Sequence, residues 1–174
     1  RGLGDVYKRQ ENTIAYLYKR ASTMGGSLKT KENKSPTFLV WAMADAQGTN
    51  LQRVQIIKGW LDNGESKEKV FDATCSDGLE VDKSSHRCPD NGAKVNLNDC
   101  SISKNKGSRE LKTLWKDPEF IEDQEAFYYV RVLENPVCRW STWDAIRSNQ
   151  LPRSDIKSTI QERAWSSPIW ITNY

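Results

Sequence analysis

The sequence contains a single histidine, His86, among its 174 residues, and this scarcity limits the chemistry that the chain can carry out. A hydrolytic metal site needs several His, Asp or Glu ligands that converge on the ion, and a catalytic triad needs a histidine base beside its nucleophile. Neither a nucleophile elbow nor a catalytic-cysteine context surrounds His86. We therefore predict no catalytic residue, no metal ligand and no cofactor in this chain.

Long apolar runs and a strong charge imbalance are missing too. No stretch approaches the roughly 20 apolar residues of a membrane-spanning helix. The formal net charge is +3, and residues 1–10 supply +2 of it through three cationic side chains and one aspartate. The remaining residues are almost neutral. We therefore expect neither a nucleic-acid partner nor a membrane span.

The first ten residues, RGLGDVYKRQ, have neither an initiator methionine nor the features of a signal peptide. The whole decapeptide looks like the translation of an adapter used to build sequencing libraries. We therefore expect residues 1–10 not to be native, and the true reading frame to continue upstream into another domain.

Four cysteines are present, and three of them lie in one polar stretch. They form no Cys-x-x-Cys pair, which argues against a zinc site but leaves it as an alternative. An even number of cysteines in loops favours two disulfides and an oxidising compartment over free thiols, but the sequence leaves the pairing open. The candidate disulfide cysteines are Cys75, Cys88, Cys100 and Cys138.

The chain then divides into two parts. Apolar residues recur at helical spacing over 11–21, and the Gly25-Gly26 pair interrupts this pattern. We interpret residues 11–34 as a helix and a Gly-Gly linker that belong to a preceding domain. Residues 35–174 are predicted to form one β-rich domain.

Strand patterns fill much of that domain. Residues 37–44 are apolar on both alternating faces, which is typical of a central strand. Residues 51–61 and 67–74 flank Asn63-Gly64, a strong hairpin signal, so these three segments are expected to form a meander. Residues 75–108 form a long cysteine-containing loop with one short strand at 94–97.

The second half continues this pattern. Residues 110–115 form a short strand or helical turn, and residues 126–134 give the strongest strand signal, although Arg131 in its middle needs a partner. Ser141 or Thr142 caps a short helix to Arg147, and residues 159–172 make a last strand. The fold class predicted is therefore mainly β: an antiparallel immunoglobulin-like β-sandwich with one or two short helices.

One cluster combines arginines, carboxylates and tryptophans. Guanidinium groups pair with carboxylates or phosphates, and tryptophan rings accept cations and sugars. It forms either a surface that closes over a ligand or a neighbouring domain, or a buried ion-pair network with the tryptophans in the core. Its members are Arg139, Trp140, Trp143, Asp144, Glu162, Arg163 and Trp165.

Several long strings resemble one bacterial family: PTFLVWAMAD, LQRVQIIKGWLD, EKVFDATCSDG, HRCPDNGA, ELKTLWKDPEF, AFYYVRVLENPVCRWSTWDAIR and TIQERAWSSPIWI. From about residue 11 to residue 174, the chain resembles the C-terminal region of the proteins of domain of unknown function 3604. That family is similar to metal-dependent hydrolases of the polymerase-and-histidinol-phosphatase (PHP) type.

The resemblance implies that any metal ligands, and a divalent metal, lie in an α/β domain upstream. It also implies an exported protein, periplasmic or extracellular, which agrees with the cysteine argument. The function expected is that of a non-catalytic C-terminal β-domain whose partner is the missing N-terminal domain. The alternative is a module that binds carbohydrate or a protein partner through the Trp/Arg cluster.

Overall fold

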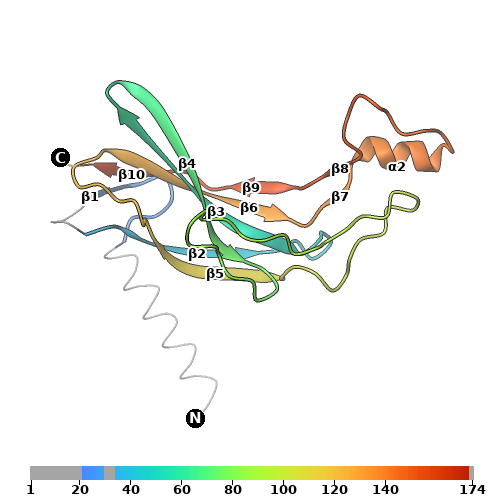
Figure 1. Ribbon diagram of the computed structural model, residues 1–174, viewed down its shortest axis with the longest axis horizontal. Helices are drawn as coiled ribbons and strands as arrows, with labels where there is room; N and C mark the ends of the chain where they lie inside the picture. The colour runs from blue at the N-terminus through green and yellow to red at the C-terminus, as the bar shows by residue number, and fades with distance from the viewer. Residues whose placement is uncertain (1–20, 30–33, 173–174) are drawn as a thin grey trace, which may run out of the picture.

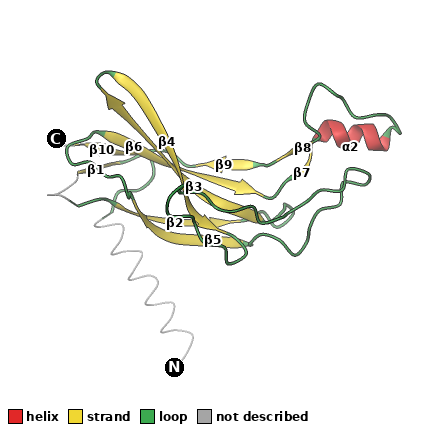
Figure 2. Ribbon diagram, in the orientation of Figure 1, coloured by secondary structure: helices red, strands yellow, loops and turns green. Residues whose placement is uncertain are grey.

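The computed structural model describes residues 21–29 and 34–172 (Figure 1). The predicted helix at 11–21, apart from its last residue, and the decapeptide 1–10 lie outside the described residues. Figure 2 shows that strands dominate and that α2 is the one helix of the described part. The elements are β1 (Ser27–Lys29), β2 (Thr37–Met43), β3 (Leu51–Asp62), β4 (Glu65–Cys75), β5 (Glu110–Lys116), β6 (Ala126–Glu134), β7 (Val137–Cys138), α2 (Trp140–Arg147), β8 (Thr159–Ile160), β9 (Arg163–Trp165) and β10 (Ile169–Thr172).

The larger sheet has six strands in the order β1-β10-β6-β3-β4, and β9 also pairs with β6. Its pairings are antiparallel except β1 with β10, which is parallel and departs from the predicted all-antiparallel pattern. The β3–β4 hairpin turns at Asn63 and Gly64, which both have positive φ, as the Asn-Gly signal predicted. The strand predicted over 159–172 is divided into β8, β9 and β10.

The meander prediction is wrong at its first strand. β2 pairs with β5, from Thr37↔Lys116 to Met43↔Glu110, and these two strands form a sheet of their own. The turn expected after β2 does form, with Gln47 N–H donating to Asp45 Oδ1 at 2.9 Å. It leads the chain into the other layer instead of into a neighbouring strand, because the partner of β2 comes much later in the sequence.

The hydrophobic core lies between these two sheets. Phe38 and Val40 of β2 and Leu111 of β5 pack with Val54 and Ile56 of β3 in one buried cluster. This arrangement confirms the predicted mainly β, sandwich-like fold. The two layers are far less equal in strand number than those of an immunoglobulin sandwich.

A buried polar group links the layers at one end of the core. Lys58 Nζ of β3 lies 2.7 Å from Asp117 Oδ2, just after β5, and the Tyr128 hydroxyl donates to the same oxygen at 2.8 Å. Lys58 Nζ also donates to the Glu119 carbonyl at 2.9 Å. Burial of these groups is tolerated because they are paired and hydrogen-bonded, and their contacts join the two layers at this point.

The long loop between β4 and β5 carries the disulfides, as predicted. Cys75 pairs with Cys88 and Cys100 pairs with Cys138. The first disulfide closes the loop onto β4, and the second joins it to β7. The strand expected at 94–97 is reduced to a single bridge between Val95 and Ile102.

Candidate functional site

The Trp/Arg cluster predicted from sequence is divided between two places. Arg139, Trp140, Trp143 and Asp144 lie in or beside α2, at the far end of the β7–β8 projection, whereas Glu162, Arg163 and Trp165 lie in or beside β9 on the large sheet (Figure 1). Within the described part of the chain, no hydrogen bond or ion pair joins the two groups.

The α2 group is open to solvent. The helix begins at Trp140, one residue before the predicted cap. Arg139 stands at the N-cap without a side-chain capping bond, and its Nε donates to the Lys157 carbonyl at 3.1 Å. The Thr142 hydroxyl instead donates to the Ser158 carbonyl at 2.8 Å and ties α2 to the returning segment. Trp140 is 68% exposed, and the Arg147 guanidinium lies over the Trp143 ring at 5.3 Å.

A shallow hollow beside α2 has a volume of about 200 Å³, which is below the usual range of small-molecule sites. Its lining mixes the exposed Trp140 ring and Leu151 with polar and charged side chains. It therefore offers little enclosure for a ligand. The lining residues are Trp140, Ser141, Asp144, Ala145, Ser148, Gln150, Leu151 and Arg153.

The β9 group belongs to a larger surface. Side chains alternate across a strand, and since Tyr128 and Val130 of β6 face the core, the odd-numbered residues of β6 face away from it. Register partners on β9 and β10 share that outer face. We call this surface the β6 face; it consists of Phe127, Tyr129, Arg131, Arg163, Trp165 and Trp170.

Aromatic rings cover one half of the β6 face. Phe127 and Tyr129 are nearly parallel, with ring centroids 6.3 Å apart and an interplanar angle of 13°. Trp170 packs against Phe127 at 5.2 Å and is 47% exposed. The Phe127 ring lies over Gly59, where a Cβ atom would overlap its Cζ and Cε atoms. One face of that ring is therefore held against the sheet.

A hydrogen-bonded row crosses the other half. Gln55 Nε2 donates to Asp72 Oδ1 at 2.6 Å, and Arg131 Nε donates to Gln55 Oε1 at 2.8 Å. Arg131 is the register partner of Trp165, which is 59% exposed. This row supplies the partner that the sequence analysis required for Arg131.

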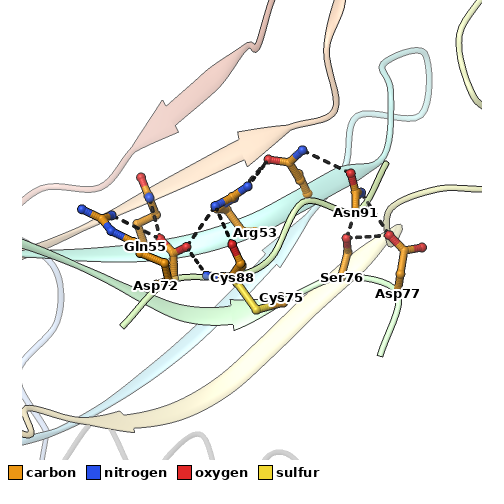
Figure 3. The surroundings of a disulfide bond; sticks show 10 residues. Arg53, Gln55, Asp72, Cys75, Ser76, Asp77, Cys88 and Asn91 are labelled. Carbon is orange, nitrogen blue, oxygen red and sulfur yellow. Dashed lines mark hydrogen bonds and ion pairs between the residues drawn. A yellow bond between two sulfur atoms is a disulfide. The ribbon is translucent and has the colours of Figure 1, made fainter. Parts of the chain in front are cut away.

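The row is anchored in a polar network beside the Cys75–Cys88 disulfide (Figure 3). Asp72 Oδ2 accepts from Arg53 Nη1 at 3.0 Å and from the Cys88 N–H at 2.7 Å. The Asn91 amide group donates to Ser76 Oγ and Asp77 Oδ2 farther along the loop. Every one of these contacts satisfies a polar group of the fold, so the network holds the β6 face in place.

Glu162 does not take part in the β6 face. It faces the other way, towards Glu134, whose backbone N–H donates to the Glu162 carbonyl at 3.0 Å. Burial, then the negative charges of Glu162 and Asp45, raise the pKa of the Glu134 carboxyl group. Glu162 therefore repels the Glu134 carboxylate, and no ion pair between Glu162 and Arg163 is among the described contacts.

Sequence reasoning missed Phe127, Tyr129 and Trp170 as surface residues. The available signal was the pair of aromatic residues at positions 127 and 129, which share one face of a strand, together with the second tryptophan of the last predicted strand. It could not be used without the pairing of β6 with β10, because register decides which side chains share a face.

A second exposed surface lies on the opposite side of the sandwich. Leu39, Trp41 and Met43 of β2 point away from the core, and Leu39 faces Leu114 of β5 across the small sheet. The other exposed side chains of this side are Thr37 of β2 and Glu110, Lys112 and Lys116 of β5. The prediction that β2 is a central strand is therefore wrong, since one of its apolar faces is open to solvent. We call this surface the β2–β5 face; it consists of Leu39, Trp41, Met43 and Leu114.

Two features are absent from residues 21–29 and 34–172, the ranges that the structure describes. No group of three or more His, Cys, Asp or Glu side chains is placed to hold a metal ion there. None of the helices described has the length and apolar character needed to cross a bilayer.

Comparison with known proteins gives one family. Neither the curated proteins nor the solved structures include a significant match. A family model described as "Protein of unknown function (DUF3604)" matches residues 3–173, which is nearly the whole chain. The chain therefore belongs to the DUF3604 family.

Proposed function

We propose that this chain is a non-catalytic β-domain of an exported protein and that its β2–β5 face packs against another domain of the same protein. That partner domain resembles the PHP-type metal-dependent hydrolases, and it holds the divalent metal and the active site. The alternative role, a module that binds carbohydrate or a protein partner, draws support from a different surface, the β6 face.

The observation that carries the proposal is the composition of the β2–β5 face. Trp41 is 63% exposed and Leu114 is 71% exposed, on a regular sheet whose inner side already fills the core. Contiguous apolar residues of this kind on a folded domain mark an interaction site. The single cation–π contact on the face, Lys112 Nζ over the Trp41 ring at 5.8 Å, leaves most of the ring open.

Export draws support from the cysteines. All four are in disulfides, and no described cysteine is free. Disulfides persist in oxidising compartments and are rare in a reducing cytosol. Chain isolated from its own host and denatured without reductant is expected to show no free thiol, and four free thiols would contradict export.

The docking proposal is tested on the extended protein. We would recover the upstream reading frame, produce the longer protein, and compare hydrogen exchange at residues 37–43 and 110–116 with that of the isolated chain. Slower exchange in the longer protein is expected, because docking excludes water from these strands. Leu114→Glu should restore fast exchange, while Trp170→Ala on the opposite sheet serves as the control. Equal exchange in both proteins would rule out docking through this face.

A further inference from the structure

The β6 face differs in chemistry from the β2–β5 face. The β2–β5 face is mainly aliphatic and carries no guanidinium group, whereas the β6 face combines four aromatic rings with Arg131 and Arg163. Trp165 and Trp170 lie on the same flank of β6, opposite Arg131 and Phe127. Their register partners on β6 are four residues apart, which places the two tryptophans about 13 Å apart along the strand. On β6, Phe127 lies beside Trp170, and Tyr129 lies halfway between Phe127 and Arg131.

Arg131 is fixed in position. Its Nε donates a hydrogen bond to Gln55, and Gln55 donates one in turn to the buried Asp72 carboxylate. The two terminal nitrogens of Arg131 have no hydrogen-bond partner among the residues that the structure describes. A guanidinium group held through Nε loses little further side-chain entropy when its terminal N–H groups bind a ligand.

A second guanidinium group lies next to Trp165 along β9. Arg163 precedes Trp165 by two residues on β9, so both side chains project from the same face of the strand. Arg163 is exposed, and its side chain forms no described hydrogen bond or ion pair. An open indole ring is thus flanked by two cationic groups.

We propose that the β6 face binds an acidic polysaccharide whose pyranose rings bear carboxylate groups. One ring stacks on Trp165, and its carboxylate accepts hydrogen bonds from the terminal nitrogens of Arg131 and from Arg163. Aromatic ring faces pack against the C–H face of a sugar, and guanidinium groups bind carboxylates in a paired, planar geometry. Tyr129, Phe127 and Trp170 then carry the neighbouring sugar rings along the strand.

The test compares two polymers with the same backbone. Affinity electrophoresis and calorimetry would measure binding of the full chain, with its disulfides intact, to polygalacturonate and to its fully methyl-esterified form. We expect the chain to bind polygalacturonate and to bind the ester at least about tenfold more weakly, since a charge-assisted hydrogen bond is worth about 1.5 kcal/mol or more.

Variants separate this site from general attraction of a basic chain to a polyanion. Trp165→Ala and Arg163→Gln should each weaken binding about tenfold, and Arg131→Gln should do the same. Trp41→Ala, an equally exposed tryptophan on the opposite sheet, should change nothing. Thermal melting of each variant checks that the fold is kept. This experiment does not involve docking through the β2–β5 face, so failure of one proposal leaves the other standing.

Five results would overturn the proposal. Equal affinity for the two polymers would show that the carboxylates are not recognised. Binding that Trp165→Ala leaves unchanged would show non-specific attraction only. Binding confined to sulfated dextran would overturn the carboxylate assignment, and a dimer that Trp165→Ala dissolves would identify a second copy of the chain as the occupant. Absence of binding to polygalacturonate, alginate and sulfated dextran would also reject the site.

Discussion

At the scale of single residues, Gly59 is required by the ring that lies over it. A Cβ atom at this position would overlap Phe127, which is bounded on its other side by Trp170. Gly59→Ala is therefore expected to reduce the free energy of unfolding by about 1–3 kcal/mol, the usual cost of overpacking. Urea denaturation of the two proteins measures this difference.

The explanation has a direct control. In a chain that already carries Phe127→Ala, the substitution Gly59→Ala should cost far less, because no ring remains to be displaced. Equal costs in both backgrounds would mean that Gly59 is needed for its backbone and not for the space that it leaves.

Tyr128 gives the chain a predictable dependence on alkaline pH. Burial, then the hydrogen bond to Asp117 and the negative charge of that residue, raise the pKa of the Tyr128 phenol above its ordinary 10.0. The folded state therefore keeps this proton at pH values where the unfolded chain has lost it. The stability that it contributes is complete below pH 10 and is lost as pH rises towards the folded pKa, by at most about 1.4 kcal/mol per pH unit.

Urea unfolding between pH 9 and pH 11 tests this linkage. The fall in unfolding free energy should be shallower in Tyr128→Phe than in the natural chain, while Tyr129→Phe on the β6 face should follow the natural chain. A Tyr128→Phe chain that loses stability just as steeply would assign the alkaline effect to other groups.

Residue types were easier to predict than their partners. The sequence shows that Arg131 in a strong strand needs a partner, but Gln55 lies 76 positions away, and only the β3–β6 register brings them together. The sequence places Arg139 and Arg163 in one cluster because each lies within two residues of a tryptophan. The β7–β8 projection separates them, and no residue pattern marked that excursion.

At the scale of elements, α2 depends on one covalent link. Its described hydrogen bonds remain within residues 137–160, and Cys138 joins this segment to Cys100 in the long loop. This disulfide spans 38 residues, so the chain-entropy model gives it a contribution of about 4 kcal/mol. Replacing both cysteines with alanine should lower the unfolding free energy by up to that amount and speed hydrogen exchange over residues 137–160.

The other disulfide is the matched control. Cys75–Cys88 spans 13 residues, which corresponds to about 3 kcal/mol in the same model. Its removal should speed exchange in β4 and in the loop beside it, and should leave α2 unchanged. Identical exchange patterns from the two double variants would show that neither disulfide has a local role.

Strand positions followed from alternation and turn residues, but strand neighbours did not. The Asn-Gly turn fixed the β3–β4 pairing because both partners are adjacent in sequence. β2 also carries a clear strand pattern, yet it pairs with β5 more than 60 residues later. Its two apolar faces suggested a central strand, whereas one of them packs on the core and the other is open.

At the scale of the whole molecule, the sandwich presents two outer faces with different chemistry. Both are outward sides of sheets whose inner sides share one core. The β2–β5 face is suited to a protein surface because its apolar side chains are exposed together and no guanidinium group lies among them. The β6 face is suited to an anionic sugar because Gln55 holds the Arg131 guanidinium group in place. Each assignment rests on its own residues.

The β2–β5 face also predicts how the isolated chain behaves. Exposed contiguous apolar surface promotes self-association, so Trp41→Ser combined with Leu114→Lys should reduce aggregation and the binding of a hydrophobic dye. The free energy of unfolding should change little, by about 0.5 kcal/mol or less, because both side chains are exposed. Light scattering, dye fluorescence and urea denaturation measure the three quantities.

Leu61→Lys is the matched control: Leu61 is as exposed as Leu114 but stands alone near the tip of the β3–β4 hairpin. If Leu61→Lys reduced association as much as the double substitution, association would reflect exposed apolar area in general, and the β2–β5 face would lose its standing as a specific docking surface.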